Sequence, residues 1–160
     1  MKPAAADIRQ SLRAPRVHAG DPPVRVDLSS DPVSLTNGRY TTRLNELGSG
    51  FSEFDNAAVT RWSPDATCNA AGFHIYLRDL DDQFVWSAAH CPTQFESAGY
   101  KFRFDGRIAE IVRVDRGIEC HLSVCVSAQH DYEIRLLKLL NRGHTTRSIE
   151  VTSYLEWVLG

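Results

Sequence analysis

The sequence predicts an all-β fold, an antiparallel β-sandwich, on three observations. Short segments alternate apolar and polar residues with the period of two that half-buried strands need. Turn-forming Gly, Asn and Asp residues separate these segments at short intervals. No segment carries a convincing helical pattern of apolar residues. At 160 residues, the chain has the length of one domain with its own core.

The composition is that of a soluble globular domain. Hydrophobic residues make up 42% of the chain, charged residues 24%, and the formal net charge is −2. This charge gives no electrostatic reason to expect nucleic acid or an anionic membrane as a partner. The sequence has no apolar run that resembles a signal peptide or a membrane span, so we expect a cytoplasmic location.

The first 32 residues predict a disordered tail or linker. They hold five of the seven prolines and show no sustained periodicity. The strand pattern begins at Val33 and continues to the end of the chain. We therefore expect the β-sandwich domain over residues 33–160.

Residues 37–62 combine turns, aromatic rings and charges, and they hold the first candidate site. Asn37-Gly38 and Gly48-Ser49-Gly50 are turn signals, with a strand expected between them over residues 39–47. Arg61 and Trp62 follow. An exposed indole can stack on the C–H face of a sugar while a guanidinium group binds hydroxyls. The alternative is that Trp62 belongs to the core.

The second candidate site lies in a hairpin predicted from residues 73–79 and 83–88. Arg78 and Asp79 precede its turn and Trp86 follows it, so the three could form a ridge that faces either a saccharide or a neighbouring barrel domain. In the structural alternative, Arg78 pairs with a carboxylate across the hairpin, a contact that contributes at most about 1 kcal/mol at a surface. Trp86 would then fill the core.

Further strands are expected on both sides of Asp105-Gly106, a strong hairpin signal, and over residues 118–126. Residues 132–140 are apolar on both faces toward their end, which fits a strand covered on both sides, although the pattern does not exclude a helix. The last segment, residues 148–159, places Ile149, Val151, Leu155 and Trp157 on one face. Because proteins seldom leave such an edge open, we expect a second copy or a missing catalytic domain to cover it.

Residues suited to catalysis or metal binding are few. Glu119 and His121 lie on one face of a predicted strand, about 7 Å apart, and could serve as acid and base toward a sugar, but such pairs are common on solvent-facing sheets. Asp81-Asp82 is expected to be a solvated turn rather than a catalytic pair. No metal site and no cofactor is expected, because the cysteines lack the usual ligand spacing; they are Cys68, Cys91, Cys120 and Cys125. Cys120 and Cys125 should face opposite sides of one strand.

Three runs of sequence carry a family resemblance: LTNGRYTTRLNELGSGFSEFDNAAVTRW, GFHIYLRDLDDQFVWSAAHCP and EIRLLKLLNRGHTTRSIEVTSYLEWVL. In this order and spacing they resemble the N-terminal β-sandwich of the cellobiose phosphorylase family. Within that family the chain looks most similar to the phosphorylase-like region of bacterial cyclic β-1,2-glucan synthases. The likeness covers residues 35–159.

The resemblance implies part of a large sandwich similar to the mutarotase-type supersandwich. In the family, a helical linker and an (α/α)₆ barrel follow this sandwich, and the barrel carries the catalytic acid and the phosphate site. The present chain matches only the first part of the sandwich. We therefore expect a truncated, non-catalytic module that supports or dimerises a catalytic domain and binds β-glucan. The alternatives are a structural or oligomerisation module that binds no sugar, and a small mutarotase-like enzyme.

Overall fold

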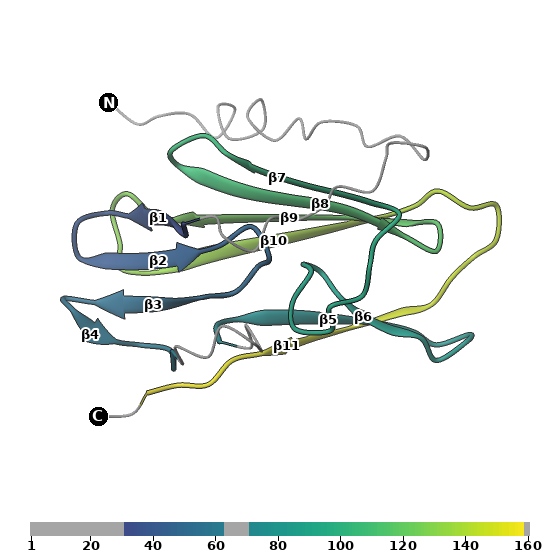
Figure 1. Ribbon diagram of the computed structural model, residues 1–160, viewed down its shortest axis with the longest axis horizontal. Helices are drawn as coiled ribbons and strands as arrows, with labels where there is room; N and C mark the ends of the chain where they lie inside the picture. Colours follow the sequence, from purple (N-terminus) through teal and green to yellow (C-terminus); the bar gives the residue numbers. More distant parts are fainter. Residues whose placement is uncertain (1–30, 63–70, 159–160) are drawn as a thin grey trace.

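The computed structural model describes residues 31–62 and 71–158, and the regular structure in these ranges consists of β-strands (Figure 1). The predicted all-β fold is therefore confirmed. Residues 1–30 of the expected tail, and Cys68, lie outside the described residues. The strands are β1 (Val33–Thr36), β2 (Tyr40–Leu44), β3 (Gly50–Phe54), β4 (Ala57–Ala58), β5 (His74–Asp79), β6 (Val85–Ser87), β7 (Gly99–Phe104), β8 (Ile108–Asp115), β9 (Ile118–Val126), β10 (Glu133–Asn141) and β11 (Ile149–Tyr154).

The strands form three antiparallel sheets. Their orders are β1-β2-β3-β4, β10-β9-β8-β7 and β11-β5-β6. The inward side chains of all three sheets meet in a single hydrophobic cluster, which includes Leu44 of β2, Leu77 of β5 and Leu122 of β9. The β7–β10 sheet thus covers the other two, and Figure 1 shows β7 and β11 at opposite sides of the molecule.

Turn residues set the register of the hairpins, as the sequence predicted. Asp105 accepts hydrogen bonds from the N–H groups of Arg107 and Ile108, and β7 pairs with β8 across this turn. The strand predicted over residues 118–126 is β9, with Cys120 buried and Cys125 half-buried on opposite faces. The hairpin of residues 73–79 and 83–88 is also present, as β5 and β6.

The prediction of a strand over residues 132–140 is correct, but the prediction that both faces of this strand are covered is wrong. These residues form the strand β10, but β10 pairs only with β9 among the described residues and is therefore an edge strand. Ile134, Leu136 and Leu140 are exposed on one of its faces. The strand expected over residues 148–159 is shorter, because β11 ends at Tyr154.

Candidate functional site

An aromatic platform lies on the outer face of the β1–β4 sheet. In the register of β2 and β3, Arg43 stands opposite Phe51, on the face that points away from the core. The ring centroids of Phe51 and Trp62 are 5.6 Å apart, and the guanidinium carbon of Arg43 lies 5.6 Å from the Phe51 ring. Glu53 completes the group, with its carboxylate 3.7 Å from Arg43 Nε. We call these four residues the Trp62 platform.

Trp62 is open to ligands, since 56% of its surface is exposed. The alternative that Trp62 belongs to the core is therefore excluded. Its neighbour Arg61 has 72% of its side chain exposed and pairs with Glu156, with 3.3 Å between Nη1 and Oε2. Arg61 also donates its backbone N–H to the carbonyl of Glu156, which ties this segment to the one after β11. The first candidate pair thus lies at an accessible surface.

The residues of the second candidate site, Arg78, Asp79 and Trp86, do not share one surface. Arg78 is exposed and pairs with Glu150 of β11 at 3.4 Å, so its carboxylate partner comes from the neighbouring strand and not from across the hairpin. Asp79 is fully buried and forms an ion pair with Arg147. Trp86 is also fully buried, with its ring stacked against Phe84. These burials correct the expectation of a shared sugar-facing ridge and place Trp86 in the core, as the structural alternative held.

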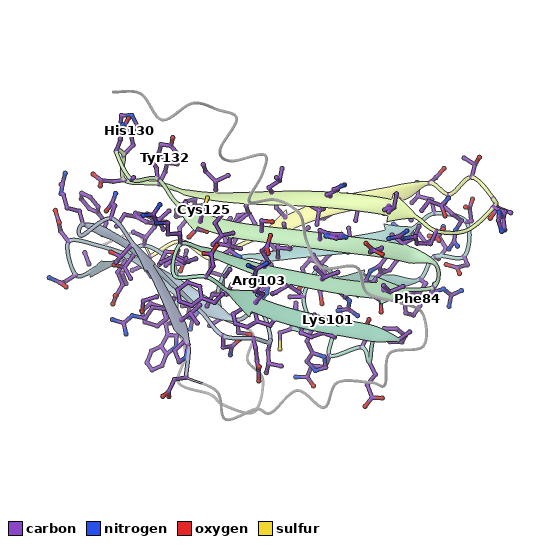
Figure 2. All side chains as sticks on the ribbon, turned by 90° about the horizontal axis from the view of Figure 1, so that it is seen from above. Phe84, Lys101, Arg103, Cys125, His130 and Tyr132 are labelled. Atoms are coloured by element: carbon purple, nitrogen blue, oxygen red, sulfur yellow. The ribbon has the colours of Figure 1, made fainter. Side chains whose placement is uncertain are left out.

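A cavity of about 560 Å³, which no pattern in the sequence predicted, lies on the inner side of the β1–β4 sheet. Its lining residues come from segments that are far apart in the chain, and a local sequence pattern cannot predict that such segments come together. Tyr132, just before β10, and Trp157, after β11, are both well exposed. In Figure 2, Tyr132 lies beside His130 at the end of the sheet where β10 begins, and their rings are stacked at 6.0 Å. The lining residues are Tyr40, Phe54, Val59, Thr60, Phe73, Asp131, Tyr132, Glu133, Leu155 and Trp157.

A polar network surrounds Glu133, one of the residues that line this cavity. The carboxylate of Glu133 accepts hydrogen bonds from Thr42, Ser52 and Arg135, the last two at 2.7 and 2.8 Å. Burial alone would raise the pKa of Glu133, but the charge of Arg135 and these hydrogen bonds outweigh burial and lower it. Arg135 in turn donates to the backbone carbonyl of Phe73 at 3.0 Å, which joins β10 to the start of β5.

The predicted acid–base pair is held in a structural ion cluster. Glu119 Oε1 lies 2.5 Å from His121 Nε2, and its Oε2 accepts a hydrogen bond from Arg142 at 2.9 Å. Burial would raise the pKa of Glu119, but the hydrogen bonds from His121 and Arg142 outweigh it and lower the pKa. Both oxygens of this buried carboxylate already have partners, which suits a structural role better than proton transfer.

Metal-ligand clusters and membrane-crossing helices do not occur in the part of the chain that the structure describes. Within it, no three His, Cys, Asp or Glu side chains are grouped to hold an ion. No helix there has the length and hydrophobicity to cross a bilayer. Cys91, Cys120 and Cys125 are free thiols.

Comparison with known proteins gives one family and two relatives. The family model described as glycosyl hydrolase 94, supersandwich domain, matches residues 33–160. The cyclic β-(1,2)-glucan synthase of Rhizobium meliloti (strain 1021) is 35% identical over 148 residues, which are 92% of this chain and 5% of that protein. The N,N′-diacetylchitobiose phosphorylase of Vibrio proteolyticus is 25% identical over 128 residues, 77% of this chain and 16% of that protein. The chain thus spans a small part of the length of the curated relatives it matches.

Proposed function

Since the chain belongs to the glycosyl hydrolase 94 supersandwich family, as its sequence motifs indicated, we propose that it is a non-catalytic module of β-glucan metabolism. In this proposal, the module supports a catalytic part and holds a glucan chain on the Trp62 platform. The similarity to a cyclic β-(1,2)-glucan synthase over 92% of the chain supports the glucan as ligand. Proteins that share a fold can differ in function, so the proposed glucan binding has to be argued from the residues of the site.

The observation that carries the binding proposal is the exposed indole of Trp62 beside paired charges. The apolar face of an indole stacks on the C–H face of a pyranose, while nearby carboxylate and guanidinium groups form hydrogen bonds with hydroxyls. Arg43, Glu53 and Arg61 are charged groups in or next to the platform. An open surface of this kind suits a segment within a polymer.

Titration with linear and cyclic β-1,2-glucans tests the proposal. Calorimetry or NMR of the full chain should detect binding at millimolar ligand, with the largest shift at the Trp62 indole. Trp62→Ala should weaken binding about tenfold, because stacking on a sugar is lost and such aromatic contacts carry most of the binding energy of a site. Trp157→Ala is the matched control, since Trp157 is 62% exposed but stands outside the platform.

Two results would contradict the proposal in different ways. Glucan binding that is weakened by Trp157→Ala, and not by Trp62→Ala, would remove the platform as the site. No binding at millimolar ligand would remove the carbohydrate role and leave the structural role.

An assembly role without sugar binding is a second candidate, and the exposed apolar residues of β11 favour it. Val151 is 49% exposed and Tyr154 is 45% exposed, although both lie in a regular strand. Proteins rarely leave an apolar edge strand uncovered. A second copy of the chain or a catalytic part of the protein would be its partner.

A further inference from the structure

A polar cavity of about 540 Å³ lies between three connections at one end of the sandwich. These connections are the β5–β6 turn, the β8–β9 turn and the segment between β10 and β11. Figure 1 shows them at the end of the molecule away from β1–β4, the sheet that carries the Trp62 platform. The volume lies in the usual range of small-molecule sites, roughly 300–1,000 Å³. The lining residues are Asp81, Asp82, Arg116, Thr145, Thr146 and Arg147.

Arg147 is held in a fixed position in this cavity. Its guanidinium group forms an ion pair with Asp79, which is fully buried, and its Nη1 donates to the backbone carbonyl of Arg116 at 3.3 Å. The other carboxylate oxygen of Asp79 accepts the backbone N–H of Asp81 at 2.9 Å. Because a buried ion pair with such hydrogen bonds is costly to disturb, a cation is presented to the cavity in a preorganised place.

Arg147 and Asp81 both keep hydrogen-bonding capacity for a ligand. The Nε atom of Arg147 lies 3.9 Å from Oδ2 of Asp81, which is beyond hydrogen-bond distance. A hydroxyl group placed between these two atoms can accept a hydrogen bond from the Nε–H group and donate one to the carboxylate. The Asp81 side chain is 59% exposed and the Arg147 side chain 21%, so a ligand can reach both.

Arg116 and Asp82 form a second donor–acceptor pair in the lining. The guanidinium group of Arg116 is ion-paired with Asp82, and its central carbon lies 4.7 Å from the centroid of the Phe84 ring. Arg116 has φ +49° in the two-residue turn between β8 and β9, a place that favours Asn or Gly. The backbone conformation therefore does not explain an arginine here, whereas the contacts of its side chain do.

The chemistry of the lining favours a neutral ligand with several hydroxyl groups. Guanidinium groups donate, carboxylates accept, and the hydroxyls of the exposed Thr145 and Thr146 can do both. Sugar hydroxyls also donate and accept, so they match this set. The carboxylates of Asp79, Asp81 and Asp82 outnumber the two guanidinium groups, which disfavours an anion such as phosphate.

We propose that this cavity is a second saccharide site. One hydroxyl of a sugar unit binds between Asp81 and Arg147, and other hydroxyls bind the pair of Arg116 and Asp82. The site works by hydrogen bonds and not by stacking, since none of the described lining residues is aromatic. The choice of a β-glucan as the sugar rests on the proposed function, whereas the cavity and its chemistry do not. A glucan that reaches both the platform and the cavity gains affinity over either site alone.

An NMR titration of the full chain with a β-1,2-linked glucose disaccharide tests the proposal. The Trp62→Ala variant serves as the background, so that stacking at the platform does not contribute. We expect shifts of the backbone amide signals of Arg116 and Thr146 and of the Nε–H signal of Arg147. Inorganic phosphate at the same concentration should leave these signals in place.

Asp81→Asn should weaken this binding about tenfold, because the hydrogen bond that a sugar hydroxyl donates to Asp81 loses its charge assistance. Asp55→Asn is the matched control, since the Asp55 side chain is 55% exposed and is also ion-paired with an arginine. Asp55 lies in the turn between β3 and β4, at the other end of the molecule in Figure 1. This control should leave the binding unchanged, and neither substitution should alter the melting temperature by more than a few degrees.

Three outcomes would overturn the inference. The first is the absence of shifts around the cavity, and the second is binding that Asp81→Asn leaves intact or that Asp55→Asn weakens equally. The third is a response to phosphate and not to the disaccharide, which would make the cavity an anion site. The same titration of the wild-type chain separates this inference from the proposed function. Shifts around the cavity without a change at the Trp62 indole would contradict only the platform, and the reverse would contradict only the cavity.

Discussion

A comparison of Trp86 with Trp157 shows what decides whether an aromatic residue in or beside a strand is buried or exposed. The two residues lie on different sides of the sandwich. Trp86 is fully buried, with Phe84 stacked on it, in a hairpin that the β7–β10 sheet covers. Trp157 is 62% exposed and follows β11, a strand of which only Ile149 packs against the core while the other residues are exposed. Both follow apolar patterns that predict inward side chains. The covering layer, which is supplied by distant segments, makes the difference.

The covered side also buries an ion pair. Arg113 and Asp115 are both completely buried and are joined by two hydrogen bonds of 2.5 and 3.0 Å. Arg113 also donates one N–H group each to the carbonyls of Ala89 and Phe95. Buried charges that are paired and hydrogen-bonded in this way are costly to disturb. On the open side, the exposed pair of Arg61 and Glu156 contributes little to stability.

The largest effect is expected for Trp86→Ala. The substitution removes a fully buried indole and leaves a cavity, so the free energy of unfolding should fall by about 3–5 kcal/mol. Urea denaturation followed by circular dichroism measures the change. Trp86→Phe, which keeps most of the apolar contact with Phe84, should recover a large part of the loss. A cost below about 1 kcal/mol for Trp86→Ala would mean that this side is not closely packed.

An intermediate effect is expected for Glu133→Gln, at the boundary between the two sides. A Gln side chain keeps the shape but weakens charge-assisted hydrogen bonds with Thr42, Ser52 and Arg135, which should cost about 1–3 kcal/mol at neutral pH.

The lowered pKa of Glu133 also sets the direction of a pH effect. A carboxyl group whose pKa is lower in the folded state stabilises the fold above its unfolded pKa, near 4.5, and this stability is lost as the pH falls through the lowered folded value. Wild type should therefore lose part of its stability in acid, and Glu133→Gln should show a smaller loss over the same pH range. Parallel stability curves for the two proteins would contradict this role of Glu133.

The contrast between the two sides also explains how far the sequence could predict the molecule. Alternation and turn residues are local signals, so the hairpin at Asp105-Gly106 and the strand β9 were predicted almost residue by residue. The strand expected over residues 39–47 ends early, at Leu44, because the Asn45 side chain accepts hydrogen bonds from the backbone N–H groups of Leu47 and Ser49 and forms a turn. Asn is a common turn residue, so the end of this strand has a local signal in the sequence.

The functional surfaces depended on non-local packing and were predicted less well. An apolar run such as residues 132–140 indicates that a strand has surface to bury, but it does not say that a partner is present. The exposure of Trp62 and the burial of Trp86 likewise follow from which layer lies above each residue. No local pattern predicts the cavity, since some of its lining residues are more than a hundred positions apart in the chain and meet only in the folded sandwich.

The smallest effect on stability is expected for Trp157→Ala, the counterpart of Trp86→Ala on the open side. Because most of the Trp157 surface is in water, its removal should change the free energy of unfolding by less than about 1 kcal/mol, even though the same indole is deleted. Urea denaturation under the same conditions compares the two variants directly. A cost as large as that of Trp86→Ala would show that the chain covers Trp157 in solution. The open side would then be closed by the chain itself.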